Sequence, residues 1–176
     1  VQQEAALAGA PAPTPKSRVK AEFRYPVYDL NDSIAVARTI RERGGGSADT
    51  PHLASFLGYG STNNGAFLSR VAAARLFGLI ERQGNAYVPS QRAMRILAPE
   101  HPGVDDRAGR AEAFRDVPLF RIFLNRYNGT PLPPDVGLRN AMETQYSVPR
   151  ERTQVAYRVL MDSADQAGYF EARGGA

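Results

Sequence analysis

The two histidines are the first residues to consider for catalysis, because imidazole is the side chain that most readily moves protons near neutral pH. His52 lies in the stretch TPHLASF and His101 in PEHPGVDD. Neither stands in a His-x-x-x-His or Glu-x-x-His spacing, or in a Ser and Asp arrangement of triad type. The chain has no cysteine, which excludes a thiol nucleophile, a disulfide framework and a thiolate metal site. We therefore expect no enzyme, no metal ion and no cofactor.

Two further features are similar to ligand motifs but have simpler interpretations. Asp105 and Asp106 are adjacent carboxylates in a Pro/Gly loop, a context more typical of solvent-facing residues than of a metal site. The stretches RGGGS and GYGSTNNG are rich in glycine, yet they lack the Lys-Ser/Thr pair and the preceding strand of a phosphate-binding loop. Both stretches predict turns.

A set of polar side chains at the start of a helix, followed by a hairpin, has the chemistry of a nucleic-acid contact. Asparagine can read adenine through two hydrogen bonds, and arginine can read guanine or hold a phosphate. The alternative is structural: Ser61 and Asn63 cap the helix, Asn64 fills the turn, and Arg82 is a solvated hairpin charge. The residues predicted to contact DNA are Ser61, Asn63, Asn64, Ser69, Arg70, Arg82, Gln83 and Asn85.

The distribution of charge also favours a DNA contact within residues 50–98. The formal net charge of the 176 residues is only +4, so its placement matters more than its sum. Residues 50–98 carry Glu81 as their single acid against Arg70, Arg75, Arg82, Arg92 and Arg95. The middle third of the chain is therefore the basic one.

The elements that must position these residues follow a recognisable order. Capping residues at 31–33 and a Gly44–Gly46 stop predict a first helix, and Asp49 or Thr50 with Pro51 begins a second. A third helix is expected from Asn63 to Phe77. Helix, helix, turn, helix and hairpin in this order form the winged-helix arrangement of the helix-turn-helix group, in which the third helix enters the major groove.

The hairpin has its own signals in LFGLIERQGNAYVP. Gly78 suits the left-handed position after the third helix, and Gly84-Asn85 suits the tight turn between two short apolar runs. A last helix of this unit begins at Ser90. The core is predicted to combine apolar positions of every element: Ile34, Ile40, Leu53, Leu57, Phe67, Val71, Ala74, Leu79 and Ile80.

A helical wheel of the third helix divides its residues into two sides. The side predicted to face the core holds Phe67, Leu68, Val71, Ala74 and Gly78, with Arg75 near it. The side predicted to face outward holds Thr62, Gly65, Ala66, Ser69, Ala73 and Leu76. Small residues let a DNA groove or another protein approach closely, so the wheel leaves both partners open.

The second half of the chain repeats this order at an offset of 90 residues, with Gly78 matched by Gly168. Its last helix carries apolar residues around much of its circumference, so it must be covered by the first unit or by another subunit. Val155, Val159 and Leu160 are the predicted interaction residues, with a homodimer or a protein partner as one expectation and contact between the two units as the other.

The stretches YPVYDLNDSIAVARTI and TPHLASFLGYGSTNNGAFLSRVAAARLFGLIERQGNAYVPS resemble a bacterial family of tandem winged-helix-like proteins. That family has a helix-turn-helix-wing N-terminal half and a helical C-terminal half that ends in a helix like TQVAYRVLMDSADQAGYF. The resemblance covers roughly Tyr25 to Phe170. It implies a tandem winged-helix-like fold and supplies no activity.

Together these observations predict a mainly α fold with a small β-hairpin wing, built as tandem winged-helix-like units. We expect a flexible tail at 1–24, a winged-helix unit at 25–98 and a second such unit with a reduced wing at 99–176. The apolar runs are too short to span a bilayer, and we expect a cytoplasmic protein. The predicted function is binding of double-stranded DNA by a regulatory protein, and the alternative is an adaptor that binds another protein through the third helix and the apolar last helix.

Overall fold

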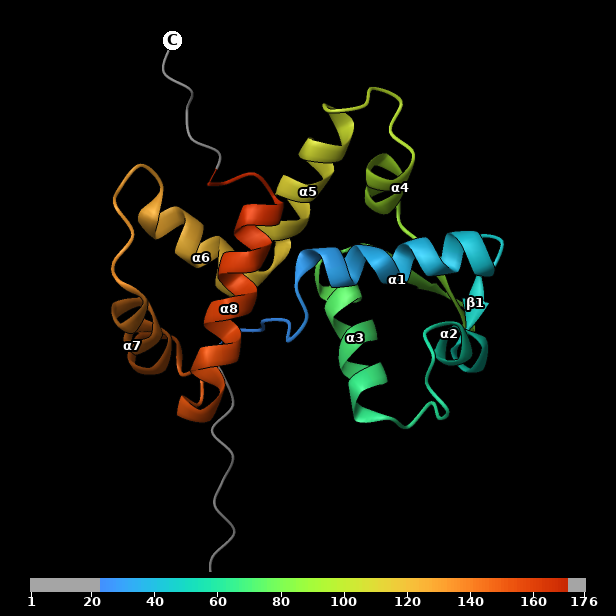
Figure 1. Ribbon diagram of the computed structural model, residues 1–176, viewed down its shortest axis with the longest axis horizontal. Helices are drawn as coiled ribbons and strands as arrows, with labels where there is room; N and C mark the ends of the chain where they lie inside the picture. Colours follow the sequence, from blue (N-terminus) through green and yellow to red (C-terminus); the bar gives the residue numbers. More distant parts are fainter. Residues whose placement is uncertain (1–22, 171–176) are drawn as a thin grey trace, which may run out of the picture.

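The computed structural model describes residues 23–170, and within this range it contains eight helices and one three-stranded antiparallel sheet (Figure 1). The prediction of a mainly α fold with a small β wing is confirmed. Most of the predicted tail at 1–24, and residues 171–176 with the reduced second wing, lie outside the described residues. None of the helices between residues 23 and 170 combines the length and the apolar character needed to cross a membrane.

The first three helices have the predicted order. Helix α1 spans Leu30–Arg43, α2 spans Thr50–Phe56 and α3 spans Gly65–Leu76. Asp29 caps α1 and Asp49 caps α2, each by accepting a backbone N–H in the first turn, and Pro51 stands in the first turn of α2. The predicted cap of α1 at residues 31–33 was wrong, since these residues lie inside the helix, whereas the predicted cap of α2 at Asp49 is confirmed.

The sheet contains the wing. Strand β1 is Ala48–Asp49, β2 is Ile80–Gln83 and β3 is Ala86–Pro89. The strand order is β1-β3-β2, with β2 and β3 joined by the turn at Gly84 and Asn85. Gly78 and Gly84 both have positive φ, as the hairpin signals predict.

The remaining helices follow in sequence. Helix α4 spans Gln91–Leu97 and α5 spans Asp105–Asp116. Helices α6 at Pro118–Tyr127, α7 at Asp135–Tyr146 and α8 at Arg150–Gln166 correspond to the three helices predicted for the second half. Figure 1 shows α5 and α8 between the first three helices on one side and α6 and α7 on the other.

One continuous core joins the two halves. The predicted core residues of the first half belong to it, with Leu57 partly buried at its edge. The ring centroids of Phe77, which follows α3, and Phe120 of α6 are 6.0 Å apart. The predicted boundary near residue 98 falls in the loop between α4 and α5, but the buried side chains run across it.

The helical wheel assigned three residues of α3 to the wrong side. Leu68 was placed on the core side and is 52% exposed, whereas Ala73 was placed outside and is 1% exposed. Arg75 is exposed. For Ala73 the reason is that residues 23–27 lie along α3 beside Ser69, Ala72, Ala73 and Leu76. This strap buries a flank of small residues that an isolated helix would leave in solvent.

The two halves share the way in which their third helices end. Gly78 and Gly168 both have positive φ. The N–H of Leu79 donates to the carbonyl of Ala74, and the N–H of Tyr169 donates to that of Ala164, at 2.9 Å in both cases. The second half contributes no strand within residues 99–170. The interpretation as two related units stays a prediction.

Candidate nucleic-acid interface

The polar residues before α3 hold its first turn. Asn64 is the N-cap, and its side-chain oxygen accepts the backbone N–H groups of Ala66 at 2.9 Å and Phe67 at 3.2 Å. The hydroxyl oxygen of Ser61 accepts the N–H of Asn63 at 3.2 Å. The cap is therefore Asn64 rather than Ser61 or Asn63. To read an adenine through both amide atoms, Asn64 would have to release these bonds.

Arg70 is turned toward α1. Its guanidinium lies 3.8 Å from the carboxylate of Asp32 and 4.7 Å from the ring centroid of Tyr28. Its side chain is 27% exposed. Ser69 lines the groove between α3 and the strap at 23–27. Neither residue extends freely from the outer face of α3, so both have structural contacts that compete with the predicted role.

The wing presents its polar residues to solvent. Gln83 and Asn85 are exposed at the tip. Arg82 donates from Nε to the carbonyl of Gly84 at 3.2 Å, and its guanidinium is 5.6 Å from the ring centroid of Tyr87. These contacts orient Arg82. It has no acidic partner among the described residues, so its charge is available to bind an anion.

The outer face of α3 is almost uncharged. Its exposed residues, at successive turns of the helix, are Gly65, Leu68, Ala72 and Arg75. Arg75 is the cation of this set and stands at the C-terminal end. Leu68 and Ala72 were not among the predicted contact residues, because the helical wheel placed Leu68 in the core and assigned Ala72 to neither side.

The basic excess of the middle third is partly neutralised by α5. Arg92 pairs with Asp116 at 2.6 Å, and Arg95 makes two hydrogen bonds to the carboxylate of Glu112. The hydrogen bonds from Arg95 lower the pKa of Glu112 below its usual value. Two of the five arginines therefore serve the contact between α4 and α5.

The histidines and the paired aspartates have local roles. His52 contacts Asp49, whose pKa is lowered chiefly by the backbone N–H of His52. Asp105 and Asp106 were expected to face solvent in a loop, but they are the partly buried first residues of α5, where they accept the backbone N–H groups of His101 and Gly103. Within residues 23–170, no three His, Asp or Glu side chains gather in the geometry of a metal site.

The predicted interaction residues of α8 are covered by this chain itself. Val159 is 2% and Leu160 is 4% exposed, and Val155 is partly buried. Helix α8 packs against α1, α5 and α7. These side chains are therefore buried within the chain, by helices of both halves, and their burial does not require a second subunit.

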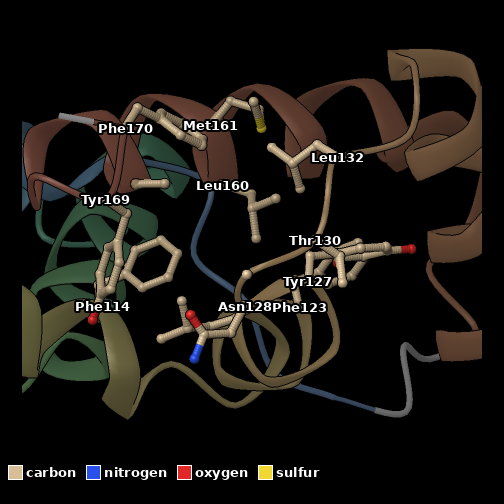
Figure 2. Close-up of a pocket in the computed structure, with 13 residues that line it drawn as sticks. Phe114, Phe123, Tyr127, Asn128, Thr130, Leu132, Leu160, Met161, Tyr169 and Phe170 are labelled. Atoms are coloured by element: carbon tan, nitrogen blue, oxygen red, sulfur yellow. The ribbon is translucent and has the colours of Figure 1, made fainter. Parts of the chain in front are cut away.

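An apolar pocket of about 260 Å³ lies between α6, α8 and the loop at 128–132 (Figure 2). Sequence reasoning missed it, because its walls come from segments that are distant along the chain. The only local signal was the density of aromatic residues in PLFRIFLNRYNG and QAGYF. Residues that line it include Phe114, Leu132, Leu160, Met161, Tyr169 and Phe170.

Compared with known protein families, curated proteins and solved structures, the chain matches none significantly.

Proposed function

We propose that this chain is a non-enzymatic DNA-associated regulatory protein whose α3 and wing contact duplex DNA. The observation that supports this proposal is the order α1-β1-α2-α3-β2-β3 with the strands arranged β1-β3-β2. In a helix-turn-helix protein with a wing, this arrangement sets the third helix and the hairpin tip side by side against the duplex.

The groups available for contact determine the mode of binding. Arg75 and Arg82 are exposed cations without acidic partners among the described residues, and Asn63, Gln83 and Asn85 are exposed polar residues near them in the chain. Gly65 and Ala72 leave room for close approach of α3 to a groove. Because each phosphate contact adds about 0.9 to the magnitude of the slope of log K against log salt, two cations predict a slope of only about −1.8.

The test is a fluorescence anisotropy titration of the full chain with random duplex DNA at about 50 mM and 200 mM salt. Arg82→Ala and Arg75→Ala should each weaken binding to all duplexes and reduce the slope by about 0.9. Arg158→Ala is the matched control, because Arg158 is an exposed cation on α8. Absence of salt-dependent binding by the unmodified chain would contradict the proposal.

A second candidate function is an adaptor that binds a partner protein through the outer face of α3. The observation that favours it is the exposed apolar side chain of Leu68, 52% exposed, beside Gly65 and Ala72. Ala72→Arg separates the two proposals. An added cation at the centre of this face should strengthen duplex binding if the ligand is DNA, and should leave the chain without duplex binding if the partner is a protein.

A further inference from the structure

The apolar pocket between α6, α8 and the loop at 128–132 has the size of a small-molecule site. Its volume of about 260 Å³ exceeds the ~150 Å³ of an apolar cavity that holds benzene. Figure 2 shows the rings of Phe114 and Tyr169 on one side, Leu132 and Thr130 on the other, and the side chain of Leu160 between them. The space therefore fits one ring with a small substituent.

The lining selects for a neutral and apolar occupant. None of the described residues that line the pocket is charged, so a charged ligand would lose its hydration without gaining a counterion. Water is also a poor occupant, since a buried water needs two to four polar partners. The hydroxyl of Tyr169 donates its proton to the carbonyl of Ala111 at 3.3 Å, so it could only accept a hydrogen bond from a water.

Aromatic walls and a polar rim further restrict which ligands fit the pocket. Phe114 lies 4.9 Å from Tyr169 and 5.0 Å from Phe120 between ring centroids, which makes one wall an aromatic cluster. Asn128 and Thr130 are exposed at the rim, and within the described residues neither side chain makes a hydrogen bond. A ligand can therefore place its ring against the wall and one polar group at the rim.

Two large apolar side chains also lie at the mouth of the pocket, beside the polar rim. Leu132 and Phe170 are 41% and 42% exposed, although both are large apolar side chains that line the pocket. A bound ring would cover part of this surface and gain the free energy of burying it. We propose that the pocket binds a small neutral molecule that has one aromatic ring and one hydrogen-bonding group. This inference does not depend on DNA binding.

The experiment uses the full chain labelled with ¹³C in its leucine and methionine methyl groups. The probe is p-cresol, and 4-methylbenzoate is the probe of similar size that carries a charge. We expect p-cresol to cause saturable shifts at the methyl groups of Leu132, Leu160 and Met161, with nuclear Overhauser contacts from its ring to Leu160, and 4-methylbenzoate to bind at least about tenfold more weakly, a difference of ~1.4 kcal/mol.

Leu132→Asp tests the pocket, and Val136→Asp is the matched control, because Val136 is 55% exposed and does not line the pocket. Leu132→Asp should weaken p-cresol binding at least about tenfold, while Val136→Asp should leave it unchanged. If a variant fails to fold, the nuclear Overhauser contacts between p-cresol and Leu160 in the unmodified chain still test the proposal.

Three results would overturn the proposal. The first is no saturable shift at Leu160 and Met161 up to the solubility of p-cresol. The second is equal or tighter binding of 4-methylbenzoate. The third is broadening at Leu132 that depends on protein concentration and not on p-cresol, which would show that a second copy of the chain fills the pocket.

Discussion

The backbone N–H of Leu30, the first residue of α1, donates a hydrogen bond of 3.2 Å to the hydroxyl oxygen of Ser163 in α8. The N–H of Asn31 donates in turn to the side-chain oxygen of Gln166 at 2.7 Å. The N–H of Asp32 donates to the side chain of Asp29, so the first turn of α1 is satisfied partly by its own cap and partly by the last helix. The two halves of the chain are therefore linked through a helix terminus as well as through the core.

Ser163→Ala should destabilise the protein by about 1–3 kcal/mol, because it leaves the buried N–H of Leu30 without an acceptor. Gln166→Ala is the control. The bond from Asn31 to Gln166 is exposed, so water can replace the lost acceptor and the change should stay within about 0.5 kcal/mol. Urea unfolding of both variants measures the difference. Equal losses of stability would show that the buried hydrogen bond contributes no more than the exposed one.

Gly78→Ala should be more harmful than Gly84→Ala. Both glycines have positive φ, which costs an L-residue about 1–2 kcal/mol. At Gly84 an added Cβ meets open space, whereas at Gly78 it collides with the guanidinium of Arg92. That group donates to the carbonyl of Phe77 at 2.9 Å and pairs with Asp116. We expect at least about 1 kcal/mol of additional loss for Gly78→Ala in thermal unfolding, and similar losses would contradict the clash.

Val71→Asp and Leu68→Asp place the same charge on α3 in opposite environments. Val71 is 6% exposed, so Val71→Asp buries an unpaired carboxylate at a cost of about 3–5 kcal/mol and should unfold the first half. Leu68 is exposed, and its variant should remain within about 0.5 kcal/mol of the unmodified chain. Thermal unfolding followed by circular dichroism measures the stability of both variants. A large loss for Leu68→Asp would mean that the helix is rotated relative to the structure described above.

Acidification should weaken the contact between α4 and α5. Hydrogen bonds from Arg95 lower the pKa of Glu112 below its usual 4.5. A carboxyl whose folded pKa is lowered contributes stability above its unfolded pKa and loses it as the pH falls through the folded value. Glu112→Gln should therefore be less stable at pH 7 and show a shallower loss of stability below pH 4.5.

The control for this change is Glu143→Gln, because Glu143 is exposed on α7. Urea unfolding at a series of pH values should give the same profile for Glu143→Gln and the unmodified chain. A profile for Glu112→Gln that also parallels the unmodified chain would show that its pairing with Arg95 contributes nothing to stability in solution.

Local signals along the chain were sufficient for most elements of this fold, but α5 and the short strand β1 were not predicted. Caps at Asp49 and Ser90, proline in the first turn of α2, and glycines 78 and 84 at positive φ act within a few residues of themselves. For this reason the helix order, the hairpin and most of the core could be predicted. The three helices of the second half were predicted by laying the second half over the first at an offset of 90 residues.

Long-range packing decided which surfaces of those elements are free. The sequence determined that α3 has a flank of small residues and that α8 is apolar on several sides, but not what covers them. In the structure, residues 23–27 lie beside the first, while the continuous core of the chain buries Val159 and Leu160. Arg70 contacts Asp32, and Arg95 contacts Glu112, across different elements. Periodicity records the side on which a residue lies, whereas burial and ion pairing depend on neighbours that only the folded chain brings together.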